Sequence, residues 1–176
     1  MTAGRRDLGA ARICLTAWLA SVGFLALGGW ALTRLGPHIP NGSRLWADAY
    51  DFGQALWSAA AGYAILLAAF WLLVFGLGAA RSRSGGRTGA IASLLFALAM
   101  VTALLFCFLH ASPGLFDGPI DSCMRQYSRA HPADPCLDCG IHSCEGMILR
   151  RVALTGALIV GALMAVSLWL RRRALD

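Results

Sequence analysis

Lysine is absent from this sequence and acidic residues are few: 15 of the 176 residues are Lys or Arg, all of them Arg, and 9 are Asp or Glu. Charged residues make up 14% of the chain and hydrophobic residues 58%, whereas an ordinary soluble domain has about 25% charged residues. This balance indicates a chain whose solvent is a lipid bilayer. Walker loops and GxSxG elbows, which indicate nucleotide binding or hydrolysis, are also missing. The exclusive use of arginine, with abundant Ala, Gly and Leu, is typical of a GC-rich bacterial genome.

Four stretches without Asp, Glu, Lys or Arg are long enough to cross the roughly 30 Å hydrocarbon layer as helices: residues 13–33, 55–80, 88–112 and 152–170. We therefore expect an all-α membrane protein, in which residues 1–176 form one domain built as a four-transmembrane-helix bundle. Ion-coupled transporters and proton relays need charged groups inside the membrane, so the lack of such groups disfavours those functions.

Small residues recur every four residues in these stretches, which in lipid allows helix backbones to approach closely. The clearest runs are Ala60, Ala64 and Ala68 in the second stretch, and Ala153, Ala157, Gly161 and Ala165 in the fourth. This spacing predicts compact packing of the helices.

The arginines are unevenly distributed among the segments that connect these stretches. Nine lie in the N-terminal tail, the short second connection and the C-terminal tail, which contains Arg171, Arg172 and Arg173; six lie in the two longer connections. The positive-inside rule then predicts cytoplasmic N and C termini in a bacterial inner membrane, with residues 113–151 on the extracytoplasmic side. The net charge of +6 is thus an orientation signal, and we expect no nucleic-acid partner. The expected partners are the bilayer and another membrane or extracytoplasmic protein.

Four of the six cysteines lie in the connection 113–151: Cys123, Cys136, Cys139 and Cys144. An even number of cysteines in an oxidising compartment favours two disulfides, for which three pairings are possible. Each bridge would stabilise the segment by about 2–4 kcal/mol. Our main prediction is a binding or assembly component, not an enzyme and without a cofactor, which presents this cysteine-rich outer loop.

Cys136 and Cys139 also form a CxxC motif, a spacing typical of pairs that open and close in thiol exchange. With four membrane helices and outer cysteine pairs, the chain resembles in architecture the bacterial disulfide-generating quinone reductases and the relatives of vitamin K epoxide reductase. The resemblance implies a membrane thiol-disulfide oxidoreductase linked to a quinone. Cys136 and Cys139 would exchange with a partner thiol, Cys123 and Cys144 would form the second pair, and Arg150 or Arg151 would lie near the quinone head. The chain departs from both patterns, because the connection 34–54 has no cysteine and no membrane stretch carries a CxxC.

The same connection offers donors for a metal. Cys136, Cys139 and Cys144 together with His131 or His142 would complete a tetrahedral zinc shell of the Cys3His type. The spacing differs from that of the standard zinc fingers and ribbons, and an oxidising compartment favours disulfides over thiolate ligands. Zinc is therefore the expectation only if this connection is cytoplasmic.

Overall fold

The computed structural model describes residues 2–35, 44–81, 86–130, 132 and 137–174, and this part of the chain is helical, without a strand. The helices are α1 (Thr2–Leu35), α2 (Arg44–Trp71), α3 (Leu77–Arg81), α4 (Gly86–His110), α5 (Asp117–Ala130) and α6 (Leu137–Arg173). A π-helical turn (Leu72–Gly76) joins α2 to α3, and a 3-10 turn (Pro113–Phe116) lies between α4 and α5. The predicted all-α class is confirmed.

Four segments are long and apolar enough to cross a membrane: Leu8–Arg34, Asp48–Arg81, Gly86–His110 and Gly140–Arg173. Each overlaps one of the four predicted stretches, so the expected set of membrane-capable helices is confirmed. The helix ends fit the positions of prolines, which disfavour a helical conformation in the residue before them. The first helix ends two residues before Pro37 and α4 ends three residues before Pro113.

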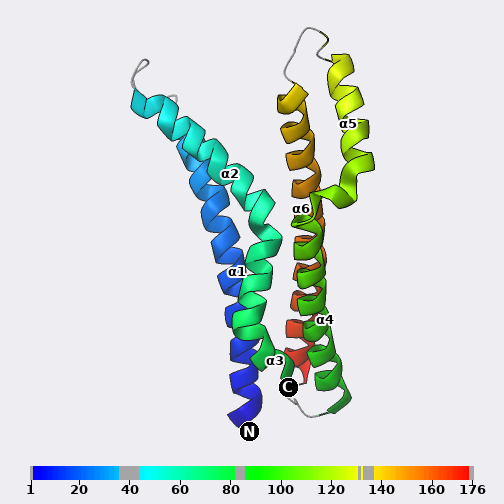
Figure 1. The fold of residues 1–176 in the computed structure, drawn as a ribbon. Coiled ribbons are helices and arrows are strands. Elements are labelled where there is room, and N and C mark those ends of the chain that lie inside the picture. The colour runs from blue at the N-terminus through cyan, green and yellow to red at the C-terminus, as the bar shows by residue number, and fades with distance from the viewer. Residues whose placement is uncertain (1, 36–43, 82–85, 131, 133–136, 175–176) are drawn as a thin grey trace.

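The long helices form two pairs, α1 with α2 and α4 with α6 (Figure 1). Helix α2 also packs on α6 and thereby joins the pairs. Both termini lie at one end of the molecule, where the pairs meet, and the pairs diverge toward the other end, where α5 and the first turns of α6 lie (Figure 1). A chain that crosses a membrane four times has both termini on the same side, which agrees with this arrangement.

The buried stripes of the helices follow a period shorter than four residues. Beyond Arg151, the buried side chains of α6 are those of Ala153, Ala157, Val160, Met164, Ser167 and Arg171. The small-residue run matches this stripe only at its first two members, because Gly161 is half-buried and Ala165 is exposed. An α-helix has 3.6 residues per turn, so a strict spacing of four drifts by about 40° at each step. In α2, by contrast, all three alanines of the run are buried.

Helices α1 and α2 cross with their backbones close together at Gly29 and Gly53. A Cβ atom at Gly29 would lie 2.5 Å from the backbone nitrogen of Trp57 and 2.7 Å from the carbonyl oxygen of Gly53. A Cβ atom at Gly53 would lie 2.9 Å from the backbone nitrogen of Thr33. Backbone atoms cannot rotate away as a side chain can, so only glycine permits this approach.

Two indole groups also tie α1 to α2. The Nε1–H of the buried Trp18 donates to the carbonyl oxygen of Ala64 at 2.9 Å, and the Nε1–H of Trp71 donates to the hydroxyl of Ser21 at 3.0 Å. A polar group without a partner is costly in an apolar environment. These hydrogen bonds therefore help to fix the register of the first two helices.

Candidate functional site

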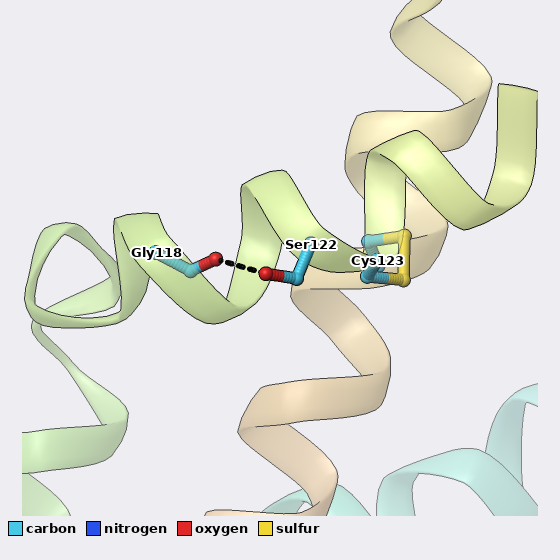
Figure 2. Close-up of a disulfide and its surroundings, with 4 residues drawn as sticks. Gly118, Ser122 and Cys123 are labelled. Carbon is cyan, nitrogen blue, oxygen red and sulfur yellow. Dashed lines mark hydrogen bonds between the residues drawn. A yellow bond between two sulfur atoms is a disulfide. The ribbon is translucent and has the colours of Figure 1, made fainter.

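Helix α5 folds back along the start of α6 and is joined to it by a disulfide (Figures 1 and 2). The bond links Cys123 to Cys144, 21 residues apart, with 5.8 Å between their Cα atoms. Cys144 is 1% exposed. We call α5 and residues 137–151 of α6 the α5–α6 hairpin. The connection predicted as a loop is therefore largely helical in its described part.

The sequence of α5 favours a short amphipathic helix. Pro119 lies in its first turn, where a missing N–H group removes no helical hydrogen bond, and Asp117 and Arg129 have the charges that suit the helix dipole at each end. One face packs on α6 at Gly140, where an added Cβ atom would lie 2.9 Å from the ring of Tyr127 and 3.2 Å from Cε of Met124. Polar residues cover the exposed face, including Ser122, Arg125, Gln126 and Arg129.

The structure brings together two of the predicted site residues. Cys123 and Cys144 form one of the three pairings that the sequence leaves open, and it is the pairing that the family resemblance implies. Cys136 and His131 lie outside the described residues, as does the side chain of Cys139. The role of the CxxC motif in thiol exchange therefore stays a prediction.

The Cys123–Cys144 bond occupies one of the ligands of the predicted zinc site. A sulfur atom in a disulfide is not a thiolate, so Cys144 in this pair is not available to a metal. His142 is exposed on α6. Within the residues that the structure describes, no group of three or more His, Cys, Asp or Glu side chains could hold a metal ion.

A groove of about 360 Å³ lies between α2, α4 and α6 at the end of the bundle where the helix pairs diverge. We call it the outer groove because it lies at the end of the bundle away from both termini. Its walls consist largely of small residues, which leave the space open, and its polar groups come from all three helices. The lining residues are Ala55, Ser58, Ala59, Gly62, Tyr63, His110, Gly146, Leu149 and Arg150. Each charged or titratable side chain among them is a base or a phenol, and no described carboxylate lines the groove.

Helix α6 carries the disulfide and the outer groove on different faces. Successive residues of an α-helix are rotated by about 100°, so Gly146 lies about 160° around the helix from Cys144, and Arg150 about 120°. Arg151, by contrast, lies within about 20° of Cys144. The Nε–H of Arg150 donates to the carbonyl oxygen of Gly146 at 3.0 Å, which holds the guanidinium group along the groove side of the helix.

A second polar cluster lies among the helices at the end with the termini, centred on Arg171, which is only 2% exposed. Its guanidinium group donates to the carbonyl oxygen of Ala79 and, at 3.2 Å, to the hydroxyl of Ser93. The carbonyl groups in the last turn of a helix have no partner within it and form the negative end of its dipole. Ala79 belongs to the last turn of α3, so a buried cation is well placed there.

Arg171 is a residue whose role the sequence interpretation missed, because it was assigned to the charged C-terminal tail. A signal was present: Arg171 continues the buried stripe of Val160, Met164 and Ser167 by one more turn. Ser167 belongs to the same cluster, since its hydroxyl donates to the carbonyl oxygen of Ala92 at 2.6 Å.

Comparison of this chain with family models, with curated proteins and with solved structures found no match.

Proposed function

We propose that this chain is an integral membrane protein that presents the α5–α6 hairpin as a binding or assembly surface for another membrane or extracytoplasmic protein. The observation that carries the proposal is the Cys123–Cys144 bond, which holds a polar, exposed helix on α6 at the end opposite both termini. A covalent bond reduces the freedom of such a small unit before it binds, and preorganisation of this kind favours association.

The proposed location is a bacterial inner membrane, with the hairpin on the extracytoplasmic side and both termini in the cytoplasm. The asymmetry of the arginines supports this orientation. A compartment-specific reporter enzyme inserted at Pro132, between α5 and α6, tests it. The expected result is activity of a reporter that works only outside the cytoplasm. Activity of the cytoplasmic reporter alone would reverse the orientation and restore the zinc alternative.

The assembly function is tested by site-specific photocrosslinking in cells. A photoreactive residue placed at Gln126 or Arg129 on the exposed face of α5 should give a discrete crosslinked product. The product should weaken when Cys123 and Cys144 are both changed to Ser. A matched probe at Leu158, which is 75% exposed on the apolar surface of α6, controls for random membrane contacts. Equal crosslinking from α5 and from Leu158 would contradict the proposal.

The second candidate is the thiol-disulfide oxidoreductase. Its support is the Cys123–Cys144 pairing, which leaves Cys136 and Cys139 as the other two cysteines of the segment. In this function a partner dithiol becomes a disulfide while the Cys136–Cys139 disulfide is reduced, and a quinone then accepts the two electrons and two protons. Changing Cys139 to Ser, or Cys136 to Ser, should trap a mixed disulfide with the partner. A pair that titrates below about −300 mV would instead be structural.

A further inference from the structure

The outer groove is lined by polar groups that take no part in the contacts of the α5–α6 hairpin described above. We propose that it binds the headgroup phosphate of one anionic phospholipid from the leaflet on the α5 side of the membrane. The proposal rests on the four helices spanning a membrane, and it is independent of what the hairpin binds.

The polar side chains that line the groove favour an anion. Arg150 supplies a guanidinium group, whose planar set of N–H donors suits phosphate oxygens, and His110, Tyr63 and Ser58 supply further donors. Asp51 and Glu145 lie on the same helices, but neither lines the groove. A lipid whose headgroup adds an ammonium to the phosphate gains less from such a lining than a lipid with the phosphate as its only charge.

The depth of the groove suits a headgroup. His110 is the last residue of α4 and of its membrane-capable segment Gly86–His110, so the groove lies where the hydrocarbon layer gives way to the polar interface. Toward the other end of α2, the exposed residues Leu66 and Phe70 continue the helix face of Ala59 and Gly62. That apolar surface is available to an acyl chain whose phosphate lies on Arg150.

The walls of the groove make room for the arginine. A Cβ atom at Gly62 would lie 3.9 Å from Cγ of Arg150, which is an ordinary contact distance. The side chain of Arg150 therefore lies along α2 at a position where α2 has no side chain. A large residue at Gly62 would fill the groove and crowd the Arg150 side chain from the opposite wall, while the chain keeps its arginine at position 150.

Native mass spectrometry of the detergent-solubilised full chain tests the proposal. The probes are phosphatidylglycerol, phosphatidylcholine and diacylglycerol with identical acyl chains, and the competitors are inorganic phosphate and a short-chain quinone. The variants are Arg150→Gln and Gly62→Leu, with Arg151→Gln as the matched control on the face of Cys144. Melting of the helical circular dichroism signal identifies any variant that fails to fold, and the two groove variants act from different helices.

The expected result is phosphatidylglycerol binding that exceeds binding of the other two lipids about tenfold and weakens about tenfold in Arg150→Gln and in Gly62→Leu, as the loss of a charged contact predicts. Arg151→Gln should bind within about twofold of the unmodified chain. Equal losses in Arg150→Gln and Arg151→Gln would indicate a nonspecific lipid annulus and overturn the proposal. Equal binding of diacylglycerol, or displacement of the lipid by inorganic phosphate or by the quinone, would also overturn it.

Discussion

Replacement of Gly29 by alanine tests whether α1 and α2 are held by direct backbone contact. The added Cβ atom would lie 2.5 Å from the backbone nitrogen of Trp57, whereas ordinary contacts begin at 3.4 Å. The helices must therefore separate locally by the difference, 3.4 − 2.5 = 0.9 Å. Overpacking of this kind costs about 1–3 kcal/mol, and separation also weakens the dispersion attraction, which in lipid is a main force between helices.

The neighbouring glycine supplies the matched control. Alanine favours a helix over glycine by about 1 kcal/mol, and Gly28→Ala receives the same gain as Gly29→Ala. A Cβ atom at Gly28 meets only Cδ1 of Leu56, at 3.9 Å. The difference in free energy of unfolding between the two variants therefore isolates the close approach of the backbones. We expect Gly29→Ala to be less stable than Gly28→Ala by about 1–3 kcal/mol.

The assay is unfolding of the full chain in mixed detergent micelles with increasing SDS, followed by circular dichroism and tryptophan fluorescence. Gly53→Ala should behave like Gly29→Ala, because its Cβ atom would lie 2.9 Å from the backbone nitrogen of Thr33. The double variant should lose less than the sum of the two, since the first alanine already separates the helices. Stabilities of Gly29→Ala and Gly28→Ala that agree within about 0.5 kcal/mol would refute a backbone contact at this crossing.

Three further predictions use the same unfolding assay or limited proteolysis. Arg171→Leu should destabilise the chain by about 2–3 kcal/mol because it removes charged hydrogen bonds from the cluster near the termini; the exposed Arg172 changed to Leu is the control, and equal effects would show that the burial of Arg171 is unimportant. Changing Cys123 and Cys144 together to Ser should speed trypsin cleavage at the exposed arginines of α5, because the disulfide contributes about 3 kcal/mol to the closed hairpin. The same effect should appear when the unmodified chain is reduced, and unchanged cleavage would mean that packing alone holds α5. Trp18→Phe should cost about 1 kcal/mol through loss of its hydrogen bond to α2, and a neutral result would show that the indole N–H contributes nothing.

Local information in the sequence was sufficient for the long helices. Uncharged runs of about 20 residues specify membrane-capable helices because their length must match the hydrocarbon layer, and the alanines of α2 are buried as their spacing predicts. The amphipathic helix α5 could also have been predicted from the sequence, because its apolar residues recur with the period of an α-helix. Pro113 and Pro132 flank this helix, and Pro119 lies in its first turn, where proline is tolerated.

Contacts between residues of different helices could not be predicted from such local patterns. The chain has 20 glycines, and nothing local distinguishes Gly29, whose neighbours are backbone atoms of another helix, from Gly23, which has none within 4 Å. The pairing of Cys123 with Cys144 depends on α5 folding back along α6, which brings their Cα atoms within 5.8 Å. The burial of Arg171 depends on partners from other helices, the carbonyl group of Ala79 at the end of α3 and the hydroxyl of Ser93 in α4.

The two ends of the bundle are held by different chemistry, and α6 connects them. Near the termini, Ser167 and Arg171 donate hydrogen bonds directly to α4 and α3, which fixes α6 against both helices. At the other end α6 carries the Cys123–Cys144 bond on one face and Arg150 on another. A ligand bound at Arg150 would therefore contact the same helix that carries the α5–α6 hairpin, on a face turned by about 120° from Cys144.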